Sequence, residues 1–113
     1  MSPRDPRAYL WDIAQAAEHI ARFTQGKTAT AYASDLLLRS AVERQFEIVG
    51  EALNQRTRLS PDMAGRITNV GRIIAFRNRL AHGYASIADG VVWGIIEADL
   101  PTFRREIGLL LAE

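Results

Sequence analysis

Apolar side chains recur every three or four positions along most of the chain, which is the spacing of one face of an α-helix. In the first such segment, Asp5 and Pro6 suit an N-cap and a first turn, and Gly26 interrupts the pattern. A helix is therefore predicted from about Pro6 to Gln25. A second, longer amphipathic helix is predicted from about Ala31 to Arg58.

The second half of the chain carries shorter helical patterns. Ser60-Pro61 predicts the start of a short helical segment, and a further helix is predicted from about Asn69 to Ala81, ended by Gly83. The last apolar pattern begins near Asp89 and contains Pro101, which must either kink the helix or begin a second piece. We expect one kinked helix there. No segment alternates apolar and polar positions over a useful length, so no β-strand is predicted.

Composition supports a folded helical domain. With 48% hydrophobic and 24% charged residues, the chain has an ordinary globular balance. We expect residues 1–113 to form a single all-α domain, an antiparallel bundle of four to five helices with the last one kinked near Pro101. The absence of cysteine excludes disulfides, a thiolate nucleophile and cysteine metal sites. The N-terminus lacks the apolar run of a signal peptide and no stretch is apolar enough to span a membrane, so a cytoplasmic protein is expected.

The charge of the chain is uneven although its net value is only +1. So small a net charge does not by itself predict nucleic-acid binding, which needs several cations on one surface. Between Asp62 and Asp89, however, the sequence contains no acidic residue. The basic residues and histidine of this interval are Arg66, Arg72, Arg77, Arg79 and His82. They form a local positive block.

The densest group of functional side chains lies at the end of the helix predicted from Asn69 to Ala81. Arginine and histidine in the last turn of a helix could simply stabilise its negative end. A functional interpretation is also open, because guanidinium groups bind phosphate and histidine transfers protons near neutral pH. RNA supplies its own 2′-hydroxyl nucleophile. Arg77, Arg79 and His82 could therefore cleave it without a metal or another cofactor, leaving a 2′,3′-cyclic phosphate.

Three segments resemble the HepT-like proteins of the HEPN superfamily. Residues 76–84 are similar to the family signature, an Arg-Asn pair with His five residues after the Arg and Tyr two residues later. Residues 41–52 resemble its second-helix segment, and residues 92–101 resemble its last helix. The resemblance implies a homodimer that cleaves RNA in one cleft, with Arg77 and His82 catalytic. Asn78, Arg79 and Arg72 are the expected RNA and phosphate ligands.

The resemblance also implies regulation and a partner. Such proteins are typically toxins paired with an MntA-like minimal nucleotidyltransferase, which inactivates them by transferring AMP to the motif tyrosine, here Tyr84. A bulky anionic group beside the arginines would neutralise them. Two other functions remain open: a noncatalytic HEPN module that binds a nucleotidyltransferase or nucleotide, and a purely structural helical dimer. Substitution of His82 would separate catalysis from anion binding.

Residues outside the motif carry further expectations. Gly50 lies inside the long helix, where glycine costs about 1 kcal/mol relative to alanine, so it is expected to permit the close approach of another helix, and a dimer contact could lie there. Glu47 or Glu51 could reach Arg77 and orient it.

The remaining histidine and the two tryptophans favour structural roles. His19 has no partner pattern near it, so a surface or partly buried position is expected, and a histidine-rich zinc centre within the chain is not. Trp11 and Trp93 are expected to anchor the core or an interface.

Overall fold

The computed structural model describes residues 5–81 and 89–113, and these residues form seven α-helices and no strand. In chain order, the helices are α1 (Pro6–Thr24), α2 (Ala29–Ser34), α3 (Leu36–Leu59), α4 (Pro61–Ala64), α5 (Val70–Ala81), α6 (Asp89–Ala98) and α7 (Leu100–Leu111). The predicted all-α class is confirmed. Within the described ranges, no helix is both long enough and apolar enough to cross a membrane.

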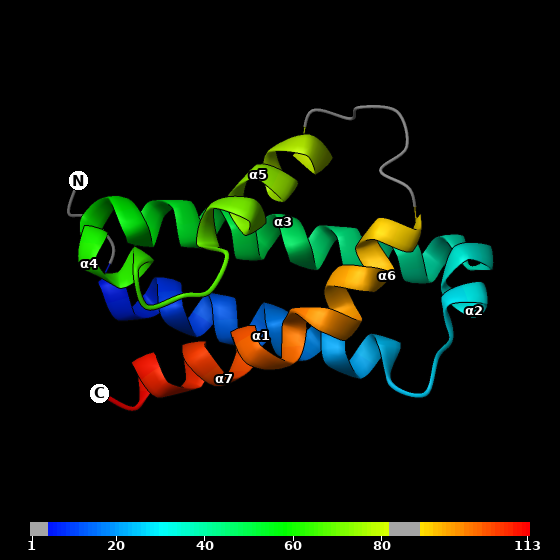
Figure 1. Ribbon diagram of the computed structural model, residues 1–113, viewed down its shortest axis with the longest axis horizontal. Helices are drawn as coiled ribbons and strands as arrows, with labels where there is room; N and C mark the ends of the chain where they lie inside the picture. The colour runs from blue at the N-terminus through cyan, green and yellow to red at the C-terminus, as the bar shows by residue number, and fades with distance from the viewer. Residues whose placement is uncertain (1–4, 82–88) are drawn as a thin grey trace.

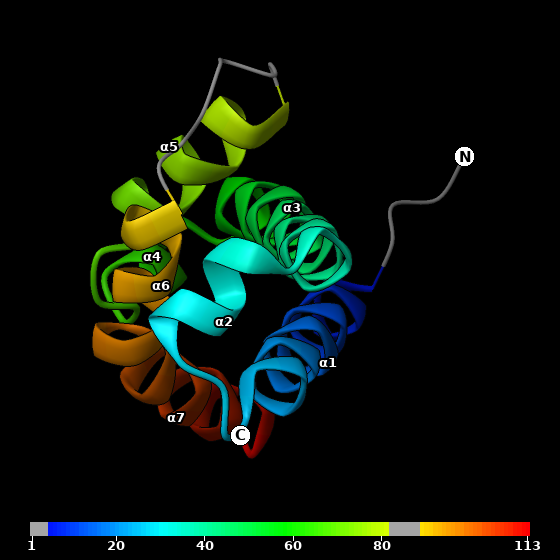
Figure 2. The ribbon, with the colours of Figure 1, turned by 90° about the vertical axis from the view of Figure 1, so that its right-hand side faces the viewer.

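Two long helices form the body of the bundle (Figure 1). Helices α1 and α3 run antiparallel and pack along much of their length, and α7 lies against the other side of α1. Helix α5 packs on α3, while α6 leads from the far end of the molecule, beside α2, toward α7. Viewed along the long axis, α1, α3, α6 and α7 surround the interior and α2 covers one end (Figure 2).

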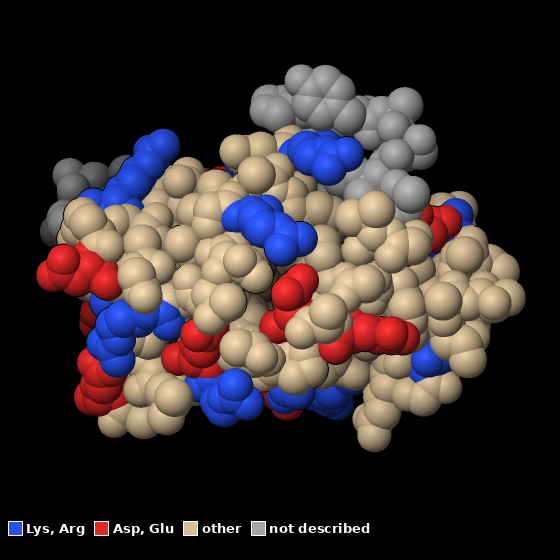
Figure 3. Space-filling model, viewed as in Figure 1, with Lys and Arg blue, Asp and Glu red and all other residues tan. Residues whose placement is uncertain are grey.

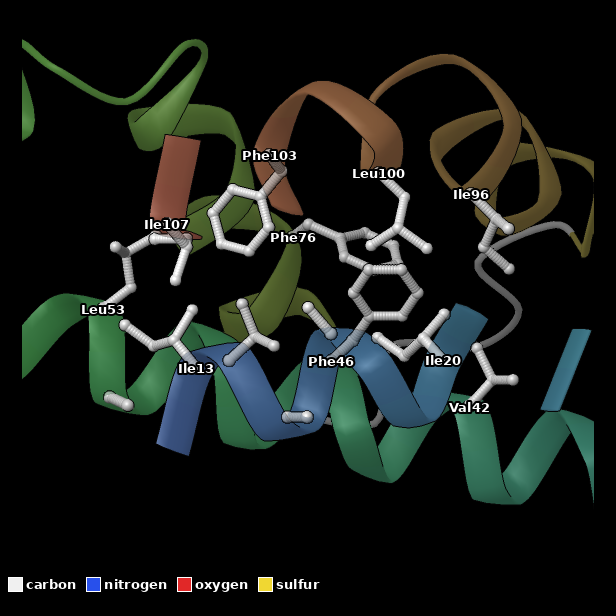
Figure 4. Packing of buried hydrophobic residues seen from close by; sticks show 14 of the residues in the cluster. Ile13, Ile20, Val42, Phe46, Leu53, Phe76, Ile96, Leu100, Phe103 and Ile107 are labelled. Atoms are coloured by element: carbon white, nitrogen blue, oxygen red, sulfur yellow. The ribbon is translucent and has the colours of Figure 1, made fainter. Parts of the chain in front are cut away.

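The interior is filled by the apolar stripes that the sequence pattern predicts (Figure 4). Ile13 and Ile20 of α1, Leu53 of α3 and Ile107 of α7 are fully buried. Each such side chain contributes about 1.5–3 kcal/mol by leaving water. Helix α5 is joined to this core by Phe76, whose ring meets the ring of Phe46 edge-to-face at a centroid distance of 5.3 Å. This aromatic pair fixes the helix that carries the motif onto α3.

The first predicted helix is confirmed at both ends. The Asp5 carboxylate accepts a hydrogen bond from the backbone N–H of Arg7 at 2.9 Å, and Pro6 occupies the first turn. The helix ends at Thr24, and Gly26 follows with φ of 72°, a left-handed conformation that glycine adopts without strain. Local capping chemistry therefore sets the length of α1.

The single helix predicted from Ala31 to Arg58 is wrong at its beginning. The structure divides this stretch into α2 and α3 at Asp35. The Asp35 carboxylate accepts a hydrogen bond from the N–H of Leu38 at 3.1 Å, and the backbone of Asp35 is extended. A side chain that caps a new helix in this way competes with continuation of the previous one.

The kinked C-terminal helix is in the structure a pair of helices, α6 and α7, that meet at Asp99. Pro101 lies in the first turn of α7, where its missing N–H leaves no hydrogen bond unmade. Backbone hydrogen bonds still cross the junction, from the N–H of Asp99 to Ile95 and from the N–H of Phe103 to Asp99. The prediction that Pro101 interrupts the helical pattern is therefore confirmed, but the prediction of one kinked helix is wrong, because a second helix begins there.

Candidate functional site

Arg77 is held in one orientation by groups from two helices. It projects from α5 toward α3, where its Nη2 lies 2.6 Å from Oε2 of Glu51. Its Nη1 donates a hydrogen bond to the side-chain oxygen of Asn78 at 3.0 Å. Only 27% of the Arg77 side chain is exposed. The hypothesis that Glu47 or Glu51 orients Arg77 is confirmed for Glu51.

Gly50 makes this arrangement possible. A methyl group added at Gly50 would overlap Cβ and Cγ of Arg77 and would touch its Cδ at 3.4 Å. The close helix approach predicted at Gly50 is therefore confirmed, and the partner is α5 of the same chain. The stem of Arg77 occupies the space beside Gly50, and the suggestion that a dimer contact lies in this region stays a prediction.

The Arg77 guanidinium borders a shallow polar groove between α1, α3 and α5. The groove has a volume of about 250 Å³ and is also lined by Arg44, Glu47 and Gln55. Gln55 donates a hydrogen bond to Glu51 at 3.3 Å, so Glu51 is itself held in place. Among the described side chains, Nε of Arg77 is buried and makes no hydrogen bond. The two terminal nitrogens of the guanidinium, in contrast, are paired with Glu51 and Asn78.

Arg72 and Arg79 lie on a different side of α5 from Arg77. Both are exposed, and both line a hollow between α5 and α6. They are seven positions apart and so point in nearly the same direction, whereas Arg77 and Arg79 are about 200° apart on the helix. The expectation that Arg77 and Arg79 share one cluster is therefore wrong. The exposed Asn78 lies beside Arg77 and holds its guanidinium.

Comparison with known proteins places the chain in a family. A family model described as ribonuclease HepT-like matches residues 13–110, which is most of the chain. This chain belongs to the ribonuclease HepT-like family. The HEPN resemblance is thus confirmed, and with it the assignment to a family of ribonucleases.

Individual relatives agree with this HepT-like assignment over nearly the full length. A Methanocaldococcus jannaschii protein named as an inferred RNase is 30% identical over 112 residues, which cover 97% of this chain and 100% of that protein. A Thermococcus cleftensis protein named as a probable ribonuclease HepT is 31% identical over 105 residues, covering 89% of this chain and 91% of that protein. No solved structure matches.

Two expected site residues of this HepT-like chain, His82 and Tyr84, lie outside the described residues, as does the predicted helix stop at Gly83. Helix α5 is described as far as Ala81, so the chain leads directly from the Arg77 site into the segment that contains both. No group of three or more His, Cys, Asp or Glu side chains in the described ranges is placed to hold a metal ion.

The residues expected to be structural behave in different ways. His19 is partly buried, lies 3.1 Å by its Nδ1 from Oε1 of Gln45, and stacks on Phe23, so its predicted structural role is confirmed. Trp93 is a core residue whose indole N–H donates to Glu97. Trp11 is 57% exposed and is not part of the core.

A polar cluster between α2, α3 and α6 was not expected from the sequence. The buried Tyr32 packs on Trp93, and burial, together with the nearby carboxylates of Glu43 and Asp89, raises the pKa of its phenol. Burial and the Asp89 carboxylate also raise the pKa of Glu43, although Arg39 opposes this shift. Nε of Arg39 lies 3.7 Å from Asp89. The cluster joins residues that are far apart in the sequence, so no local sequence pattern predicts it.

Proposed function

We propose that this HepT-like chain is a metal-independent endoribonuclease in which Arg77 and His82 act on the scissile phosphate. The observation that carries the proposal is the fixed position of Arg77, which is oriented by Glu51 and Asn78 against the bare backbone of Gly50. An arginine held before substrate arrives loses little freedom on binding, which is the condition for strong stabilisation of a transition state.

The chemistry requires only RNA and these side chains. The 2′-oxygen of one nucleotide attacks the adjacent phosphorus while its proton leaves to a base, and the bond from phosphorus to the 5′-oxygen breaks as that oxygen gains a proton. The products are a 2′,3′-cyclic phosphate and a 5′-hydroxyl. His82 serves as the proton acceptor or donor, and Arg77 stabilises the charge on the pentacoordinate phosphate. In a homodimer, two copies of His82 would be available for the two proton transfers.

The biological role proposed for this activity is that of a toxin. A partner of the MntA-like minimal nucleotidyltransferase class would transfer AMP from ATP to the Tyr84 hydroxyl, releasing pyrophosphate. The adduct adds negative charge two residues after His82, where it would compete with RNA for the arginines. AMP transfer would then act as the switch between an inactive and an active ribonuclease.

Cleavage of a labelled RNA by variants of the chain tests the proposed ribonuclease. We expect His82→Ala to abolish cleavage while retaining RNA affinity, and Arg77→Ala to reduce both. Arg105→Ala is the matched control, because Arg105 is an exposed arginine on α7, away from α5. Equal loss of cleavage and binding in His82→Ala, or full cleavage by it, would contradict the assignment and favour an anion-binding module.

Intact mass tests the proposed regulation. We expect coexpression with a minimal nucleotidyltransferase of the MntA-like class to add AMP units to the wild type and to abolish cleavage. Tyr84→Phe should remain unmodified and active under the same conditions. Modification of Tyr84→Phe to the same extent would place the target on another residue. Sedimentation of the unmodified protein would establish whether it is the proposed homodimer.

A further inference from the structure

The hollow between α5 and α6 has a different character from the Arg77 groove. Its volume is about 250 Å³, near the lower end of the range for small-ligand sites. Its lining includes Phe46, Phe76, Ile73 and Ile95, from three different helices. This apolar floor is large enough to accept a planar ring but not a folded peptide.

The rim of the hollow is basic. Arg72 and Arg79 stand on the α5 side, about 10 Å apart along the helix axis. Neither makes an ion pair with another described residue, in contrast to Arg66, which pairs with Glu113, and Arg77, which pairs with Glu51. Figure 3 shows two basic patches over α5 on the face that also carries α6, with acidic groups below them. Two uncommitted guanidinium groups beside an apolar floor are complementary to a molecule that is both anionic and flat.

Asp99 adds a hydrogen-bond acceptor to the same hollow. It occupies the N-cap position of α7, yet its side chain makes no capping hydrogen bond. Aspartate at this position usually accepts from the first backbone N–H groups of the helix. Here the half-buried carboxylate instead lines the hollow, where it can accept hydrogen bonds from a bound group.

We propose that this hollow is a subsite for one nucleotide of a single-stranded RNA, with the base on the apolar floor and the flanking phosphates at Arg72 and Arg79. This inference rests on the proposed ribonuclease function and names how its substrate is held. Asp99 accepts from the exocyclic amino group of the base, which adenine, cytosine and guanine carry and uracil lacks.

Binding of an uncleavable probe tests the subsite separately from cleavage. The probe is a fluorescent single-stranded 2′-O-methyl oligonucleotide, which lacks the nucleophilic hydroxyl. Ala75 is exposed and lines the hollow, so Ala75→Trp should fill the hollow and weaken binding about tenfold, as expected for the loss of one base contact. Ala33→Trp, at an exposed alanine on α2, is the matched control and should bind normally.

Salt dependence and base preference distinguish the roles of the rim residues. Arg72→Ala and Arg79→Ala should each lower the slope of log affinity against log salt by about 0.7, the value for one phosphate contact to a single strand. Ala75→Trp should leave that slope unchanged. Asp99→Ala should reduce the preference for an oligonucleotide of adenine or cytosine over one of uracil.

The possible failures are separable. If the wild type cleaves RNA and Ala75→Trp binds the probe as well as Ala33→Trp does, the subsite is refuted and the ribonuclease stands. If the wild type does not cleave but the hollow variants still weaken binding as described, the subsite stands and the ribonuclease falls. If Ala75→Trp instead splits an oligomer in sedimentation without weakening binding, the hollow is an interface between copies and the proposal is overturned.

Discussion

The contact between Gly50 and Arg77 leads to a prediction about Gly50→Ala. This substitution should lower the free energy of unfolding when residue 77 is arginine and raise it when residue 77 is glycine. In the wild-type background, Gly50→Ala places a methyl group on Cβ and Cγ of Arg77. Cβ is bonded directly to the backbone of α5 and cannot move without moving the helix. The substitution must therefore separate α3 from α5 or displace the arginine.

The expected size follows from two opposed effects. Alanine is favoured over glycine inside a helix by about 1 kcal/mol. Overpacking in a tight contact costs about 1–3 kcal/mol. The net loss in the wild-type background is therefore up to about 2 kcal/mol. When Arg77 is first replaced by glycine, the overlapping atoms are gone, and Gly50→Ala should instead stabilise the protein by up to about 1 kcal/mol.

The four proteins to compare are the wild type, Gly50→Ala, Arg77→Gly and the double variant. Urea unfolding of each, followed by far-UV circular dichroism, gives the effect of Gly50→Ala on the free energy of unfolding with arginine and with glycine at position 77. The helix weakening caused by Arg77→Gly is common to the two proteins that carry it, so it cancels from the comparison. We expect a coupling free energy of about 1–3 kcal/mol between the two positions. Stabilisation by Gly50→Ala in both backgrounds would refute the close packing of α3 on α5 at this point.

Three further predictions concern catalysis, packing and pH. Glu51→Gln should lower kcat about tenfold with an unchanged dichroism spectrum. Glu47→Gln is the control and should leave kcat unchanged, because the Glu47 carboxylate pairs with Arg44 instead. Equal rates for the two variants would show that Glu51 does not orient Arg77. Ile107→Ala should lower the free energy of unfolding in urea by about 2–5 kcal/mol, and a loss well below this would contradict its complete burial. Because folding raises the pKa of Glu43 above 4.5, its carboxyl group favours the folded state below that pH and loses this advantage as the pH rises. Glu43→Gln should therefore be more stable than wild type at neutral pH and equally stable at about pH 4. The same increase in the free energy of unfolding at the two pH values would refute the raised pKa of Glu43.

The helices were predictable where the signal is local. The cap at Asp5 and the glycine at position 26 bound α1 as expected, because capping depends on residues only a few positions apart. The break at Asp35 was missed because apolar spacing continues across it. Aspartate is compatible with an exposed helix position as well as with a cap, so the spacing alone does not decide between them.

The site was only partly predictable, because it depends on which side of α5 faces α3. The motif identified Arg77, and the sequence offered Glu47 or Glu51 as its partner, of which the structure shows Glu51. The 200° between Arg77 and Arg79 is also contained in the sequence. The sequence does not show that residues of α5 and α6 together line a hollow at Arg79.

Among the helices that the structure describes, α5 packs closely on α3, and it faces α6 across the hollow. It packs on α3 through Phe76 and the Gly50 contact, while the side that carries Arg72 and Arg79 borders the hollow that α6 also lines. A helix supported on one side can separate from the bundle at a cost well below that of global unfolding, so its amide protons should exchange with solvent before those of α1 and the middle of α3. The residue proposed to act on RNA thus stands on an element whose opening would expose Phe76 and Phe46 but leave the contact between α1 and α3 in place.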